Sequence, residues 1–181
     1  MLQEVILVDE SDNVTGKMEK MEVHRRSMLH RAFSVFIFNC KNEMLLQKRA
    51  TNKYHSGGLW TNTCCSHPSP GEQTIKSAAR RLNEEMGFST NLEEIFHFIY
   101  KHEFENGLTE YEFDHVFIGY HNGEISPNKE EVCDYCFMAM DAIENLLMNQ
   151  PQKFSAWFQI AFPMVRKWQQ TSTEFQKNKA G

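Results

Sequence analysis

The sequence predicts one α+β domain in which a mixed β-sheet is sandwiched between helices. Strand-like runs lie both before and after a central amphipathic segment, without the regular strand and helix alternation of a doubly wound fold. No internal repeat, low-complexity tract or Pro/Gly/Ser-rich linker divides the chain, and its 181 residues suit one domain. We therefore expect residues 1–181 to form a single domain, with a frayed tail at about residues 172–181.

Runs rich in β-branched, aliphatic and aromatic residues are expected to form the strands of this sheet. They are residues 5–8, 31–39, 43–49, 92–104, 108–120 and 131–140. The turn-forming stretch "DESDN" follows the first run, which predicts that this strand ends in a hairpin or a loop. The stretches "CKN" and "ENG" separate the next two pairs of runs and predict hairpins there. Residues 19–29 are predicted to be a short helical or irregular segment, and residues 50–62 a loop.

Residues 72–87 carry the strongest helical pattern of the chain. Their apolar residues recur at helical spacing, and Gly87 is placed to end the helix; the apolar set is Ile75, Ala78, Ala79, Leu82 and Met86. A second helix is predicted at residues 141–150 with Asp141 as its N-cap. A third is predicted at residues 155–170, interrupted near Pro163.

The overall composition bounds the partners and the compartment. The formal net charge of -5 argues against a protein that binds nucleic acid mainly through phosphate contacts. The apolar runs fall short of the ~20 residues that span a bilayer, and the N-terminus lacks the features of a signal peptide, so we expect a cytoplasmic protein that does not enter a membrane. Five cysteines, an odd number, favour free thiols, and the Cys133/Cys136 pair is interpreted as structural.

Two short stretches place reactive side chains on a common face. Glu110 and Glu112 are two residues apart in a predicted strand, and neighbouring carboxylates repel each other unless a cation or a proton lies between them. In "WTNTCCSHP" an extended backbone would point Cys65 and His67 to one face and Cys64 to the other. A metal site that combines imidazole ligands such as His67 with carboxylate ligands such as Glu110 and Glu112 suits Zn, Mn or Mg.

The helix at residues 72–87 allows two interpretations. Spacing alone suggests a surface ladder of ion pairs between Arg81 and Glu84 or Glu85. However, Glu72, seven intervening residues and "RRLNEEMGF" resemble the Nudix box, with Ser66 in place of its first glycine and Arg81 in place of a glutamate. Exchanging a carboxylate for arginine removes a metal ligand and adds a cation that can bind phosphate.

This departure is accompanied by several separate motifs, in the order "EKMEVH", "LHRAFSVFIFN", "WTNTCCSHP", "RRLNEEMG", "TEYE" and "FSAW". Together they make the chain similar to type I isopentenyl diphosphate isomerases of the Nudix superfamily. The resemblance covers almost the full length. It implies a Nudix-like fold and an isomerase of isoprenoid biosynthesis that interconverts isopentenyl and dimethylallyl diphosphate through a tertiary carbocation. It also implies a small-molecule diphosphate substrate, and we expect a monomer or weak dimer.

The resemblance further implies the site residues, by motif. The first metal (Mn, Zn or Mg) would be bound by His24, His30, His67, Glu110 and Glu112. A Mg2+ accompanying the diphosphate would use Glu85 and the backbone carbonyl of Cys65, and the catalytic residues would be Cys65, Glu112 and Tyr100. Substrate would contact Lys20, Arg49, Lys53, Arg81 and Trp157. The remaining histidines, His55, His97, His102, His115 and His121, receive no role.

Two other functions stay open at this point. An ordinary Nudix pyrophosphohydrolase would share the fold and the metal-binding helix, whereas an inactive, metal-stabilised module would only bind a diphosphate. The residues do not determine which of Cys65 and Glu112 donates the proton. We favour Glu112, acting with Tyr100, as the donor and Cys65 as the acceptor.

Overall fold

Strand β3 (His30–Phe38) is the centre of a mixed sheet. In this computed structural model, which describes residues 3–53 and 55–179 and the side chains up to residue 171, β3 runs parallel to β8 (Thr109–Tyr120). It runs antiparallel to β4 (Met44–Arg49) and to β6 (Cys64–Ser66). The parallel pairing with β8 sets His30 opposite Glu112, so it places two predicted site residues side by side.

The other strands extend this centre in both directions. They are β1 (Glu4–Val8), β2 (Val14–Glu19), β5 (Trp60–Thr61), β7 (Glu93–Glu103) and β9 (Val132–Met138). The predicted hairpins β3–β4 and β7–β8 both form, and β9 pairs with β4. After β1 the chain forms a hairpin with β2, a strand that the sequence pattern did not predict. The two short strands β5 and β6 lie at the end of and just beyond the segment predicted to be a loop.

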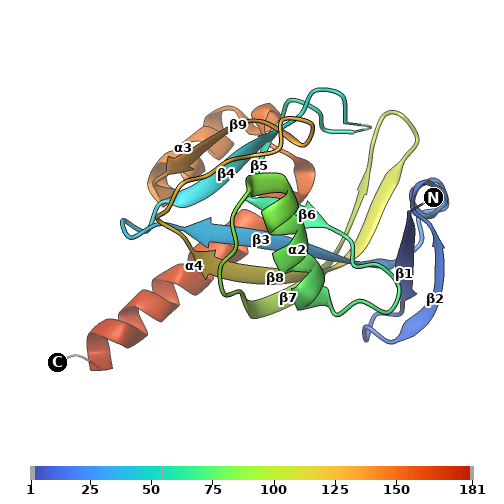
Figure 1. Ribbon diagram of the computed structural model, residues 1–181, viewed down its shortest axis with the longest axis horizontal. Coiled ribbons are helices and arrows are strands. Elements are labelled where there is room, and N and C mark those ends of the chain that lie inside the picture. Colours follow the sequence, from blue (N-terminus) through green and yellow to red (C-terminus); the bar gives the residue numbers. More distant parts are fainter. Residues whose placement is uncertain (1–2, 54, 180–181) are drawn as a thin grey trace.

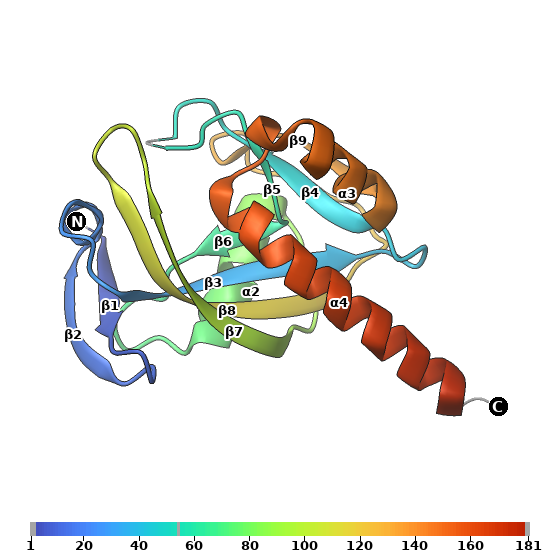
Figure 2. The ribbon, with the colours of Figure 1, turned by 180° about the vertical axis from the view of Figure 1, so that it is seen from behind.

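Two helices cover opposite faces of the sheet. Helix α2 (Thr74–Met86) lies across β3 and β8 in Figure 1, and α4 (Ala156–Lys179) crosses the same strands on the other face in Figure 2. The remaining helices are α1 (Lys20–Arg25), α3 (Met140–Asn149) and a 3-10 turn at Pro151–Lys153. The predicted arrangement of a mixed sheet between helices is therefore confirmed.

The alternation of side chains along β3 builds two cores. Phe33, Val35 and Ile37 pack on the α2 side, where Leu82 and Met86 of the helix are fully buried. On the α4 side the packing involves Phe36, Phe38, Phe158 and Phe162. Because successive residues of a strand point to opposite faces, one apolar run can serve both layers.

Helix α2 ends as the sequence predicts. Gly87 has φ 76°, the left-handed conformation that glycine adopts without steric cost, and its N–H donates to the Asn83 carbonyl. A Cβ at Gly87 would lie 2.2 Å from the Ser126 carbonyl oxygen, so a side chain cannot fit there. Ile75, in contrast, is 42% exposed and is not part of the core.

Three details of the last helices differ from the prediction. The N-cap of α3 is Ala139, while Asp141 lies in the first turn and pairs with Arg166 of α4 at 2.7 Å. Helix α4 continues through Pro163, because that residue lies on the exposed face, where solvent can satisfy the carbonyl that loses its amide partner. The helix extends to Lys179, into the segment predicted to fray; the fraying itself stays a prediction.

None of the helices in residues 3–53 and 55–179 combines the length and the apolar character needed to cross a membrane.

Candidate active site

One cavity of about 390 Å³ collects nearly all of the predicted site residues. Its walls come from α1, β4, the loop after β4, β6, α2, β7, β8 and the start of α4. The predicted residues that line it are Lys20, Arg49, Lys53, Cys65, His67, Arg81, Glu85, Tyr100, Glu110, Glu112 and Trp157. His24 and His30 are buried next to His67, outside the lining itself.

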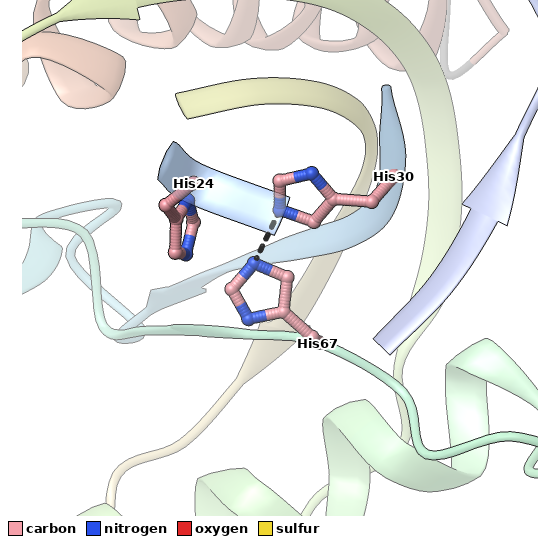
Figure 3. Close-up of side chains that lie close together, drawn as sticks. All are labelled: His24, His30 and His67. Carbon is pink, nitrogen blue, oxygen red and sulfur yellow. Dashed lines mark hydrogen bonds between the residues drawn. The ribbon is translucent and has the colours of Figure 1, made fainter. Parts of the chain in front are cut away.

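Three histidines converge beside this cavity (Figure 3). His24 comes from α1, His30 begins β3 and His67 follows β6, yet one ring nitrogen of each lies within 4.8 Å of the others. The Nε2 atoms of His30 and His67 are 3.1 Å apart. It is the only cluster of this kind among the described residues.

Backbone carbonyls fix the orientation of two of these rings. Nδ1 of His24 is 3.1 Å from the Thr109 carbonyl oxygen, and Nδ1 of His30 is 2.9 Å from that of Met28. Since a carbonyl can only accept, both Nδ1 atoms are donors, and the Nε2 atoms carry the lone pairs. Histidines that bind metals in proteins are held by second contacts of this kind.

Two carboxylates and a phenol adjoin the histidines. Tyr100 of β7 is the cross-strand partner of Glu112, and its hydroxyl lies 2.7 Å from Glu112 Oε2 and 3.0 Å from Glu110 Oε2. Glu112 Oε1 accepts from His67 Nε2 at 2.9 Å and is 3.6 Å from His30 Nε2. Tyr100 therefore joins the two carboxylates into one hydrogen-bonded group.

The two carboxylates have different charge states. Burial, followed by the charge of Glu112, raises the pKa of Glu110 to about 8. Burial would also raise the pKa of Glu112, but the contacts of its carboxylate with the His30 and His67 imidazoles hold that pKa well below its ordinary value. Of the two carboxyl groups, Glu110 is thus the one that holds a proton more readily.

Burial keeps two of the imidazoles neutral. It lowers the pKa of His24 to about 4 and that of His67 to about 3. A neutral imidazole is the form that binds a metal ion. Three clustered imidazoles with the Glu112 carboxylate in contact with two of them fit a divalent cation in chemistry, and Tyr100 links Glu110 to this group.

The adjacent cysteines on β6 face opposite sides of the sheet, as an extended backbone requires. Cys64 is fully buried in the core on the α2 side, whereas Cys65 lines the cavity. Burial raises the pKa of Cys65 well above its ordinary value, so this side chain is a neutral thiol.

The buried Trp157 forms another part of the cavity wall. Its indole N–H donates to Asn62 Oδ1 at 3.2 Å, and the guanidinium carbon of Arg49 lies 5.2 Å from the ring centroid.

Basic side chains line the cavity on the side of α2. Arg81 contacts Glu85 at 2.6 Å and Glu84 at 2.7 Å, so the predicted ion-pair ladder is present. The Nε atoms of Arg49 and Arg81 are buried and have no hydrogen-bond partner within the described part of the chain. Both guanidinium groups thus have donors available for an anion.

Sequence reasoning missed several residues of the cavity and its surroundings. His55 lies 3.0 Å from Glu110 Oε1 and stacks on Phe104 with 4.6 Å between the ring centroids. Glu131, just before β9, contacts Lys53 and Arg81. Both residues lie in irregular segments, where no periodic pattern predicts which way a side chain points. The only feature of the sequence that could have indicated His55 is its proximity to Lys53.

A second set of missed contacts holds the acids in place. Gln47 Nε2 donates to Glu85 Oε2 at 3.0 Å, and Ser34 donates to Asp114 at 2.8 Å. Burial, followed by the charge of Glu112, raises the pKa of Asp114 well above its ordinary value. Asp114 thus shares a face with the other two acids but pairs with a serine.

This fold, with helix α2 packed on the mixed sheet, is that of a Nudix protein, and residues 28–158 match the NUDIX domain family. A crystal structure from Deinococcus radiodurans has a TM-score of 0.74 over 90% of this chain and 98% of that chain, with 13% identity. A MutT protein from Methanosarcina mazei has a TM-score of 0.63 over 78% of this chain and 95% of that chain, with 20% identity. At such identities the likeness concerns the fold alone.

Curated relatives are much more similar in sequence. An isopentenyl-diphosphate Delta-isomerase of Pectobacterium atrosepticum is 48% identical, covering 96% of this chain and 97% of the relative. An isopentenyl-diphosphate Delta-isomerase 2 of Photorhabdus laumondii is 45% identical, covering 91% and 96%. The chain belongs to the isopentenyl-diphosphate Delta-isomerase family.

Proposed function

We infer that this chain interconverts isopentenyl diphosphate and dimethylallyl diphosphate. Family membership supports the reaction, and one observation carries it in the structure. The thiol of Cys65 and the hydrogen-bonded group of Glu110, Tyr100 and Glu112 face the same cavity, which four basic side chains also line.

This reaction needs two proton transfers and no redox step. A proton added to the terminal carbon of the alkene gives a tertiary carbocation, and loss of a proton from the neighbouring methylene forms the new double bond. An alkene is a weak base, so the cation must be stabilised and protected from water between an acid and a base. We propose Cys65 and Glu112 as these two groups, with Tyr100 as the residue that passes a proton to Glu112.

The charge states at rest bear on which group donates. Cys65 is a thiol and Glu112 is ionised, whereas Glu110 holds a proton that Tyr100 can transmit. Our preference for Glu112 as the donor therefore requires two prior proton movements. The proton of Glu110 moves through Tyr100 to Glu112, and the Cys65 thiol gives its proton to the carboxylate left on Glu110, so that a thiolate is present to accept. Without these movements, Cys65 would be the donor and the ionised Glu112 the acceptor. Because the reaction is reversible, the donor in one direction is the acceptor in the other.

A divalent cation fits the histidine and glutamate cluster. We propose His24, His30, His67, Glu110 and Glu112 as its ligands, and Mn, Zn or Mg as the ion. When bound, it would supply positive charge that offsets the two carboxylates. A Mg2+ arriving with the diphosphate would be held by Glu85 and the Cys65 carbonyl.

Different kinds of side chain would contact the two ends of the substrate, cationic ones the diphosphate and an aromatic one the hydrocarbon. We propose that Lys20, Arg49, Lys53 and Arg81 bind the diphosphate, with the unused Nε donors of the two arginines as support. Trp157 would contact the carbocation through its π face, an interaction worth about 1–2 kcal/mol when desolvated. A cytoplasmic location and a monomeric or weakly dimeric state stay predictions.

The test is incubation with isopentenyl diphosphate in D2O, first after chelation and then with Mg, Mn or Zn restored. We expect the dimethylallyl isomer, carrying deuterium in a methyl group, only in the presence of metal. No isomer and no deuterium uptake would refute the proposal. Phosphate release from nucleoside diphosphate derivatives would instead indicate a pyrophosphohydrolase, and binding without exchange an inactive module.

A further inference from the structure

Glu131 lies between two of the cations assigned to the diphosphate. Its Oε2 pairs with Nζ of Lys53, from the loop after β4, and its Oε1 is 3.3 Å from Nη2 of Arg81 on α2. All three side chains line the cavity and are about one quarter exposed, at 22–24%. The carboxylate thus bridges two elements that meet only in the folded protein.

The backbone fixes the position of Glu131 independently of these ion pairs. Its N–H donates to the Asn128 carbonyl at 2.9 Å, and its own carbonyl accepts from the Ala50 N–H at 2.9 Å. The backbone therefore places residue 131 at this wall of the cavity, and its side chain reaches Lys53 and Arg81 from there.

This wall of the cavity has no surplus of positive charge. Lys53 pairs with Glu131, whereas Arg81 contacts the carboxylates of Glu131, Glu85 and Glu84. A diphosphate that binds the two cations must take over their hydrogen bonds from carboxylates. It must also come to lie beside carboxylates of its own sign of charge, which disfavours binding.

We propose that Glu131 competes with the diphosphate for Lys53 and Arg81, so that tight binding at this wall requires a divalent cation to offset the displaced carboxylates. The inference rests on the proposed function, which supplies the diphosphate. It makes Glu131 a residue that determines specificity, because a diphosphate without its cation is rejected although basic side chains surround it. Glu131 thus controls recognition and takes no part in the proton transfers.

Inorganic pyrophosphate is the probe that isolates this effect. Its affinity is measured by calorimetry in chelator and in saturating Mg2+, for the wild-type chain, for Glu131→Gln and for Glu130→Gln. The last variant is the matched control, because it removes the same charge from the neighbouring residue, which is exposed.

In chelator, Glu131→Gln is expected to bind pyrophosphate about tenfold more tightly than wild type, since a charge-assisted competitor is lost. In Mg2+ the two affinities should converge, and Glu130→Gln should follow wild type in both conditions. Unchanged or weaker binding by Glu131→Gln in chelator would overturn the inference, because loss of a merely structural contact cannot strengthen binding only when metal is absent.

A second variant covers the case in which Glu131→Gln does not fold. Glu131→Asp keeps the charge but shortens the side chain, so it should shift the chelator affinity in the same direction by less, and no shift would overturn the inference. The two proposals fail separately. If the wild-type chain isomerises the substrate but the variants show no metal-dependent difference in pyrophosphate affinity, only the role of Glu131 is refuted. If the expected affinities are found but no isomerisation occurs, only the proposed reaction is refuted.

Discussion

Replacing Cys65 with alanine tests the proposed chemistry most directly, because Cys64 provides a control on the same strand. The two residues are adjacent on β6 and point to opposite faces. Each substitution removes one sulfur atom from one cysteine. Any difference between the variants must therefore arise from where the thiol points.

The expected magnitudes follow from these two environments. Cys64 is fully buried among the side chains between β3 and α2, so Cys64→Ala leaves a small void and should cost about 1–2 kcal/mol of unfolding free energy. It should not change turnover. Cys65 lines the cavity, so Cys65→Ala removes a proton-transfer group, which is worth about 10²- to 10⁴-fold in rate, or roughly 3–5 kcal/mol of barrier.

Two measurements separate the outcomes. Deuterium uptake from D2O, followed by NMR with isopentenyl diphosphate and metal, reports turnover, while thermal unfolding reports stability. We expect Cys65→Ala to be folded and inactive, and Cys64→Ala to be active and less stable. Equal loss of turnover in both variants, or near wild-type turnover in Cys65→Ala, would refute the assignment of Cys65.

Three further predictions concern the metal cluster and the aromatic wall. Removing divalent metal with a chelator should lower the melting temperature, because an ion at a hundred times its dissociation constant stabilises the folded chain by about 2.7 kcal/mol. In His30→Ala, the chelated and the metal-loaded protein should have the same melting temperature. In the metal-free protein, the raised pKa of Glu110 contributes stability that is fully present below pH 4.5 and is lost as pH rises through about 8. The lowered pKa of His24 has the opposite effect: its contribution to stability is present above pH 6.5 and is lost as pH falls through about 4. Metal affinity, measured by titration at several pH values, should accordingly increase towards pH 8 as Glu110 releases its proton, and a flat profile would contradict the assigned pKa. Trp157→Phe should lower kcat by about tenfold with a smaller effect on KM, because the indole would act mainly on the carbocation, and an effect confined to KM would contradict that role.

The amino-acid sequence by itself determined the features that depend on local periodicity. The pattern from Ala78 to Met86 and the glycine after it specify α2 and its end, because helix geometry repeats every 3.6 residues. The alternation along strands likewise fixed that Glu110 and Glu112 share a face and that Cys64 and Cys65 do not.

Only the tertiary structure decided which distant segments meet. The parallel register of β3 and β8 sets His30 opposite Glu112, and folding then places His24 and His67 beside them. His55 and Glu131 reach the cavity from irregular segments, and Pro163 is accommodated because its side of α4 is exposed. Contacts of this kind depend on burial and charge summed over the whole chain, whereas a local pattern specifies only the backbone geometry and the direction of each side chain along its own element.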